Sequence, residues 1–192
     1  MTVEKIESDP FKDRLFSGRP LAELLLRQAE GAHKRRKRAG FSAWSDNLEA
    51  NVQLTLAECT PLVPRVNWGQ EDKSTAALEV EAFDESGFYL MTSPSRIMNV
   101  PFDGDERLLL LRPSALADDP WPYESTATDG RIHYIDAGES MATSLWQGIG
   151  QHTFDAKADK ALQAFRIAVR QMLLNVSAEI DEWRLVLDSE LR

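Results

Sequence analysis

The apolar pattern near the C-terminus of the chain constrains the fold more than any other feature. Over residues 154–191, apolar side chains recur at intervals of three or four residues. They are Leu162, Phe165, Val169, Met172, Val176, Ile180, Trp183, Leu187 and Leu191. On an α-helix this spacing keeps them within an arc of roughly 100°. A stripe of this length must be buried to be stable. We therefore predict a long amphipathic helix over 154–191, with its stripe lying on a β-sheet.

The same predicted helix carries a second apolar face. Ile167, Leu174 and Leu185 fall about 120–140° around the helix from Leu162, nearly opposite the centre of the main stripe. One interpretation is that an N-terminal helix covers these residues within the same domain. The other is that they contact another protein chain, either a second copy or a different subunit, which predicts that they are exposed in the monomer. The pattern leaves both interpretations open.

Short alternating segments separated by turns predict strands in the β region, residues 76–137. The predicted strands are "ALEVEAF", "FYLMT", "RIMNVPF", "RLLLLR" and "GRIHYIDAG". The turns "DESG" and "DGDE" join four of them into two hairpins, which favours a mainly antiparallel sheet.

The N-terminal third of the chain predicts an arm followed by helices. Residues 1–18 are polar and form the predicted arm, and residues 19–60 form a helical region. A helix is expected to begin at Pro20 and to stop at Gly40. Residues 50–59 fit either a helix or a strand. The predicted fold is thus a single α+β domain over 19–192, in which the long C-terminal helix and one or two N-terminal helices pack on an antiparallel sheet of about five strands.

A basic run stands out in a chain whose formal net charge is −9. In "HKRRKRAG" the five consecutive cations are Lys34, Arg35, Arg36, Lys37 and Arg38. Cations stabilise the last turn of a helix, where unpaired carbonyl groups carry partial negative charge. The run could equally contact nucleic acid or an acidic protein surface. No aromatic residue is interleaved to stack on bases, and the helix-end interpretation is favoured over both alternatives.

Residues 112–130 predict a long loop that contains Trp121 and Tyr123. Because Trp121 lies between Pro120 and Pro122, its backbone should be extended and could present a rigid aromatic anchor to a partner. The alternative is that the ring folds back and closes the end of the core, since tryptophan is usually largely buried.

The sequence gives little support for catalysis. His133, Asp136 and Glu139 are close in sequence, with His152 and Asp155 further on, but His133 and Asp136 would point to opposite faces of a strand. There is no "GxSxG" motif and no glycine-rich phosphate loop. We expect neither a metal site nor a cofactor, and the sequence leans against an enzyme.

Cysteine content and hydropathy suggest the compartment. Cys59 is the single cysteine, so no intrachain disulfide can form. The N-terminus lacks an apolar signal region, and the longest apolar run, Leu108 to Leu111, is too short to span a membrane. These features predict a cytoplasmic protein without a membrane partner.

Together the patterns favour a non-enzymatic cytoplasmic interaction protein, a subunit or adaptor of a larger assembly and oligomeric. Ile167, Leu174, Leu185, Trp121 and Tyr123 are the candidate residues for binding a protein partner, which is another copy or a different subunit. The alternatives are an accessory nucleic-acid-binding subunit that uses residues 34–38, and a metal-dependent hydrolase or nuclease that uses His133, Asp136 and His152.

Overall fold

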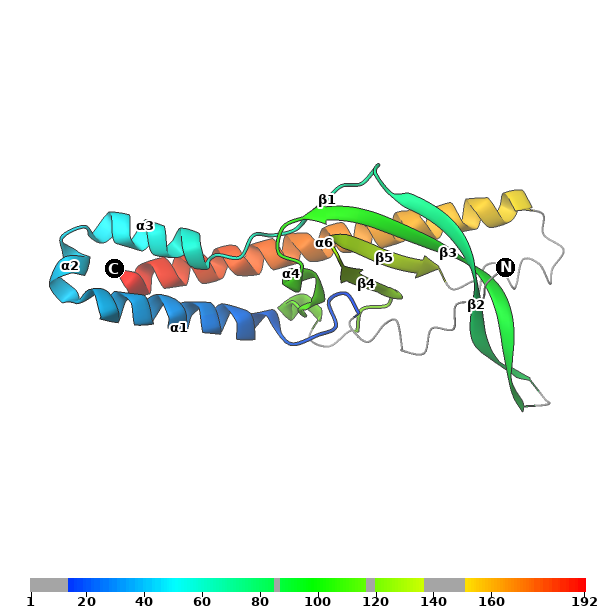
Figure 1. The fold of residues 1–192 in the computed structure, drawn as a ribbon, viewed down its shortest axis with the longest axis horizontal. Coiled ribbons are helices and arrows are strands. Elements are labelled where there is room, and N and C mark those ends of the chain that lie inside the picture. Colours follow the sequence, from blue (N-terminus) through cyan, green and yellow to red (C-terminus); the bar gives the residue numbers. More distant parts are fainter. Residues whose placement is uncertain (1–13, 85–86, 117–119, 137–150) are drawn as a thin grey trace. The chain divides into compact units, whose positions relative to one another are not determined.

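The structure is a computed structural model that describes residues 14–84, 87–116, 120–136 and 151–192, although the side chains at 75–95, 136 and 151–158 lie outside this description (Figure 1). The chain has an α+β fold with an antiparallel five-stranded sheet and a long C-terminal helix, as predicted. It divides into two compact units. The predicted single domain stays a prediction, because compactness alone does not decide whether the units fold independently.

Unit 1 contains the sheet and the first part of the C-terminal helix, within Arg65–Asp103 and Pro122–Arg170. The strands are β1 (Arg65–Val66), β2 (Asp72–Asp84), β3 (Gly87–Asp103), β4 (Ser125–Thr128) and β5 (Arg131–Asp136). β3 pairs with β1 and β2 and also with β5, and β4 completes the order on the outer side of β5. All of these pairings are antiparallel. The predicted antiparallel sheet is therefore confirmed.

Three of the predicted strands differ from the structure. "FYLMT" and "RIMNVPF" are parts of one strand, β3, whose pairing with β2 runs from Asp84↔Gly87 to Asp72↔Asn99. "RLLLLR" is not a strand but contains the short helix α4 (Arg107–Leu110). Asp105 Oδ1 accepts the backbone N–H of Arg107 at 3.1 Å, which favours a helical turn over a hairpin. The two strands that the sequence did not predict are β1 and β4, and β4 lies inside the predicted loop.

Aromatic side chains pack the first part of the C-terminal helix, α6 (Gln151–Leu191), onto the sheet of unit 1. Phe165 of α6 stacks on Tyr134 of β5, with ring centroids 4.1 Å apart and ring planes 10° apart. Tyr123 and Trp68 meet the ring of Phe165 edge to face, at 5.3 and 6.4 Å. Phe165 is fully buried and is the centre of this core.

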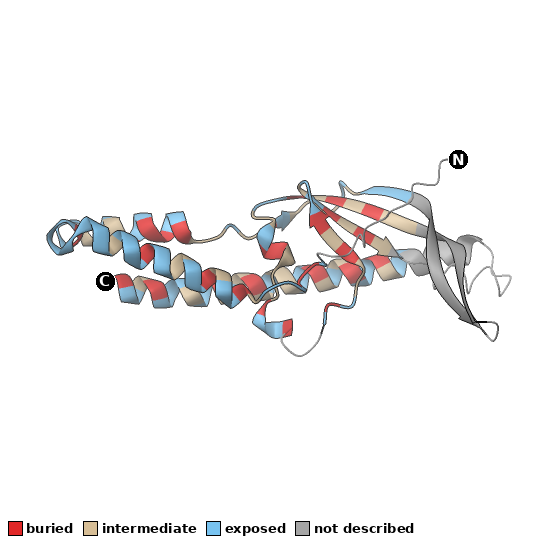
Figure 2. Ribbon diagram, turned by 60° about the horizontal axis from the view of Figure 1, so that its bottom comes forward, coloured by how far each residue is buried: buried red, intermediate tan, exposed pale blue. Residues whose placement is uncertain are grey.

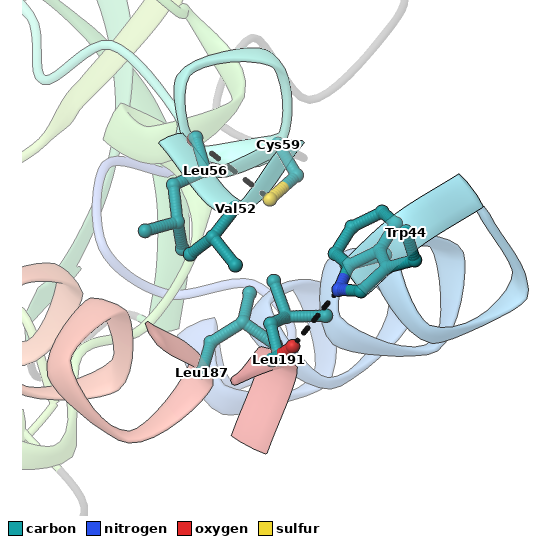
Figure 3. Packing of buried hydrophobic residues seen from close by; sticks show 7 residues of the cluster. Trp44, Val52, Leu56, Cys59, Leu187 and Leu191 are labelled. Carbon is teal, nitrogen blue, oxygen red and sulfur yellow. Dashed lines mark hydrogen bonds between the residues drawn. The ribbon is translucent and has the colours of Figure 1, made fainter. Parts of the chain in front are cut away.

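Unit 2 is mainly helical. It contains α1 (Leu21–Ala39), α2 (Phe41–Ser45), α3 (Leu48–Cys59), α4, the 3-10 helix η1 (Ser114–Leu116) and the second part of α6. Its α1, α3 and α6 segments run side by side in Figure 1 and enclose an apolar cluster. The buried members of this cluster are Ala32, Trp44, Val52, Leu56, Cys59, Leu187 and Leu191, most of which Figure 3 labels.

Helix boundaries in the N-terminal region follow the predicted signals. α1 begins directly after Pro20 and ends at Gly40, whose φ of 79° few residues other than glycine adopt. Residues 50–59, which the sequence left open, are helical, because Val52, Leu56 and Cys59 all face the core of unit 2. Burial, rather than propensity, decides between helix and strand here.

The predicted arm is partly incorporated into unit 2. Residues 1–13 lie outside the described residues, but Leu15 and Phe16 are fully buried. The backbone N–H of Phe16 donates to the carbonyl oxygen of Leu109 at 2.8 Å. These two residues therefore belong to the core of unit 2 and not to a polar arm.

The prediction that the whole apolar stripe of α6 lies on the sheet is wrong. Leu162, Phe165 and Val169 are buried in unit 1, whereas Leu187 and Leu191 belong to the helical cluster of unit 2. The helices of unit 2 bury the last part of the stripe, so the sheet covers only the first part of this 41-residue helix.

Candidate functional site

The second face of α6 is exposed. Ile167 in unit 1 is 58% exposed, and Leu174 and Leu185 in unit 2 are 63% and 74% exposed. Within unit 2, Leu174 and Leu185 fall within roughly 20° of one another around the axis of α6. Buried and exposed residues alternate along α6 in Figure 2. For these two leucines the interpretation in which an N-terminal helix covers the second face is wrong: Leu21, Leu25 and Ala32 of α1 are buried, but Leu174 and Leu185 stay exposed.

The two aromatic candidates do not lie on an open surface. Trp121 is only 4% exposed, and its ring meets Phe16 edge to face with centroids 5.0 Å apart in unit 2. Tyr123 is half-buried in unit 1, where it contacts Tyr134 and Phe165 edge to face. Both rings pack inside their own unit, as the alternative interpretation for Trp121 expected. In this conformation neither ring is presented as an anchor for a partner.

The basic run forms the last turns of α1. Two of its cations have partners within unit 2, and so does the neighbouring His33. Arg35 forms an ion pair with Glu58 of α3. Arg36 Nη1 donates to the backbone oxygen of Glu190 at 2.6 Å, and His33 Nε2 lies 3.0 Å from the carboxylate of the same residue. The last carbonyl groups of a helix lack partners within the helix. Arg36 therefore supplies one of the donors that the end of α6 needs.

Two further side chains close the same end of α6. Trp44 Nε1 donates to the backbone oxygen of Leu191 at 3.2 Å (Figure 3). Arg192 binds both carboxylate oxygens of Glu49, at 2.6 and 3.2 Å, and also reaches Asp188 at 2.7 Å. Hydrogen bonds from Arg192 lower the pKa of both carboxyl groups. These contacts tie the end of α6 to α2 and to the start of α3.

The remaining cations of the run, Lys34, Lys37 and Arg38, are exposed. Within the described residues, no carboxylate lies within ion-pair distance of any of the three. Phe41, which follows three residues after Arg38, is 86% exposed. Phe41 was not predicted as a functional residue, because it follows the basic run instead of interrupting it. Its position directly after the helix-ending Gly40 was the available signal.

The predicted metal-site alternative receives no supporting geometry in the described residues. His133 Nδ1 hydrogen bonds to Asn99 Oδ1 on the neighbouring strand at 2.7 Å. Across the described residues, no group of three or more histidine, cysteine or acidic side chains is placed to hold a metal ion. Glu139 lies outside the described residues, as do the side chains of Asp136, His152 and Asp155.

The only cysteine is buried in unit 2. The Cys59 thiol donates to the backbone oxygen of Leu56 at 3.8 Å, and burial raises its pKa (Figure 3). A protonated thiol is a poor nucleophile. Cys59 therefore serves the apolar core.

None of the helices in the described part of the chain is both long and apolar enough to cross a membrane. Comparison of the chain with protein-family models, with curated proteins and with solved structures finds no match. The exposed residues of the molecule are therefore the evidence from which a function can be proposed.

Proposed function

We propose that this chain is a non-enzymatic cytoplasmic interaction protein, a subunit or adaptor of a larger assembly, that associates with a second copy of itself through α6. The exposure of Leu174 and Leu185 carries the proposal. Leucine side chains are usually buried, and one exposed leucine needs no explanation. Two on the same face of one helix, about three turns apart, resemble the repeated anchors of a helix that docks on another helix.

The arrangement of this face suits pairing with an identical face. When two copies of a helix pack antiparallel about a twofold axis, each residue meets its counterpart across a common centre. With the centre midway between Leu174 and Leu185, each of these leucines lies opposite the other in the second copy. Ala178, close to that centre, is exposed and small, so the two helices can approach closely. Such an interface would be isologous, and it would hold four leucines.

Charge gives this model a distinctive salt dependence. Asp181 is exposed and lies between the two leucines on the same face of α6. In the antiparallel pair the two copies of Asp181 come close to one another and repel. Salt screens this repulsion, while apolar burial does not depend on opposite charges. Self-association should therefore persist or strengthen at high salt.

Light scattering behind a sizing column, at several protein concentrations and at two salt concentrations, tests the proposal. We expect a dimer mass for the wild type that persists at high salt, and a monomer for Leu174→Asp and Leu185→Asp. Leu54→Asp is the matched control, because Leu54 is 61% exposed on α3 of the same unit and should leave the dimer intact. Ile167→Asp tests separately whether the unit 1 part of the face contributes.

A wild type that is monomeric at all concentrations would overturn self-association. If Leu54→Asp disrupted the dimer as strongly as Leu174→Asp, the proposed interface on α6 would also be overturned. Circular dichroism of each variant must match that of the wild type, so that a loss of mass reports on the interface and not on unfolding.

A further inference from the structure

We propose that Lys34, Lys37, Arg38 and Phe41 form a contact surface for single-stranded nucleic acid at the end of α1. This surface is separate from the apolar face of α6 and does not depend on self-association. Within the described residues, the basic run divides into cations with internal partners and cations without them.

Two of the five cations in the basic run have a structural role. Arg35 is paired with Glu58, and Arg36 donates to the end of α6, so both have a structural role within unit 2. Lys34, Lys37 and Arg38 have no such role in the part of the chain that the structure describes. Lys37 and Arg38 lie in the last turn of α1, where cations stabilise the helix end, but this interaction leaves their charged groups exposed to solvent.

The three remaining cations lie close together on α1. Lys37 and Arg38 follow Lys34 by three and four residues within α1. Residues at these spacings are neighbours on one helix face, within an arc of roughly 100°. The three positive charges therefore point in a common direction, as a series of backbone phosphates requires.

Four carboxylates at this end of unit 2 have other partners. Glu58 is paired with Arg35, Glu49 and Asp188 are paired with Arg192, and Glu190 lies 3.0 Å from His33 Nε2. Glu30, one turn before Lys34, and Asp46 are exposed, and among the described residues neither is within ion-pair distance of Lys34, Lys37 or Arg38. Acidic residues dominate the chain, at 31 against 22 basic ones. An unneutralised group of cations is thus a local exception that suits an anionic partner.

An exposed aromatic ring follows the basic run. Phe41 is 86% exposed at the start of α2, and Trp44 of the same short helix is buried and hydrogen bonded to Leu191. The buried Trp44 anchors α2, so the backbone of Phe41 is held in a defined place beside the end of α1. An exposed aromatic ring three residues after Arg38 offers a stacking platform for an unpaired base.

These features favour a single strand over two other anionic partners. Bases in a duplex are already stacked on each other, so a duplex leaves Phe41 without a partner. Binding to an anionic membrane would need a wider apolar surface, whereas the residues next to Phe41 in the sequence are Gly40, Ser42 and Ala43. A single strand uses both the three charges and the one ring.

Fluorescence anisotropy with labelled oligo(dT) and oligo(U) of about 15 nucleotides tests the proposal on the full chain. With three phosphate contacts, affinity for a single strand should fall about 100-fold when salt rises tenfold. Lys34→Gln, Lys37→Gln and Arg38→Gln combined should abolish binding. Phe41→Ala should weaken it roughly 5- to 150-fold, the loss expected for one base stack, and Phe41→Trp should preserve it.

A matched triple variant separates local charge from net charge. Arg27→Gln, Arg170→Gln and Arg184→Gln remove the same number of exposed positive charges from other positions and should leave binding nearly unchanged. Equal losses in the two triple variants would overturn the proposed surface. So would the absence of oligonucleotide binding at low salt, a preference for a hairpin duplex that Phe41→Ala does not alter, or binding to phosphatidylserine vesicles without binding to oligonucleotides.

Discussion

Trp44 Nε1 donates a hydrogen bond to the backbone oxygen of Leu191, 3.2 Å away, so a side chain near the start of the chain closes a helix that ends almost 150 residues later. The indole ring also fills the apolar cluster of unit 2. We expect Trp44→Phe to lower the free energy of unfolding by about 1–2 kcal/mol, because it removes the donor and part of the ring. Urea unfolding followed by circular dichroism measures this loss.

Trp183→Phe is the control for that variant. Trp183 is partly buried and packs against the same cluster, but the structure assigns its indole N–H no hydrogen bond within the described residues. Its replacement changes ring size without removing a bond to a helix end. A loss of stability for Trp183→Phe that equals the loss for Trp44→Phe would show that the hydrogen bond is unimportant.

Neighbouring cations of the basic run should behave differently on substitution. Arg36→Gln removes the donor to Glu190 at the end of α6, whereas Lys37→Gln removes an exposed charge without an internal partner among the described residues. We expect a measurable decrease in the urea midpoint for Arg36→Gln, equivalent to about 0.5–1.5 kcal/mol, and a change within about 0.5 kcal/mol for Lys37→Gln. Similar midpoints for the two variants would contradict the structural role of Arg36.

Buried and exposed phenylalanines provide a further contrast. Phe165 is fully buried among Tyr134, Tyr123 and Trp68, so Phe165→Ala should destabilise unit 1 by about 3–5 kcal/mol. Phe41→Ala removes the same side chain from an exposed position and should change stability by less than about 0.5 kcal/mol. Hydrogen exchange localises each effect, and slow exchange should be lost in β5 for Phe165→Ala only.

Acid should weaken the hydrogen bonds by which Arg192 holds the end of α6 to Glu49 and Asp188. Hydrogen bonds from Arg192 lower the pKa of Glu49 and of Asp188 in the folded protein. A carboxyl group whose pKa is lower in the folded state stabilises the fold above its ordinary pKa, about 4. That stabilisation is lost as pH falls through the lowered pKa. The double variant Glu49→Gln and Asp188→Asn should therefore show a weaker decrease of the urea midpoint between about pH 5 and pH 2. A decrease as steep as that of the wild type would contradict this origin.

The thiol of Cys59 should react slowly in the folded protein. It is buried in unit 2, and burial raises its pKa, so little thiolate is present at neutral pH. Labelling with Ellman's reagent should be slow in buffer and should reach one thiol per chain rapidly in denaturant. Rapid labelling of the native protein would mean that the cluster around Cys59 opens readily.

The sequence predicted the parts of the fold that depend on local periodicity and on chain-breaking residues. Gly40 ends α1 because a φ of 79° favours glycine, and the three- and four-residue spacing of apolar side chains predicts α6. The second face of α6 could also be predicted from the sequence, since helical geometry alone places Leu174 and Leu185 on one side of the helix. The mistaken strand at "RLLLLR" arose because a short apolar run fits a helix or a strand equally well.

The sequence by itself thus determined the long helix, the antiparallel strands and the candidate residues on the exposed face of α6. Only the tertiary structure decided that the stripe of α6 is shared between a sheet and a helical cluster, and that Trp121 is buried against Phe16. It also decided that Arg35 and Arg36 have partners, whereas Lys34, Lys37 and Arg38 have none among the described residues. The physical reason is the sequence separation of the residues that interact. Periodicity acts between residues a few positions apart, whereas Arg36 and Glu190, or Trp44 and Leu191, meet only after the whole chain has folded.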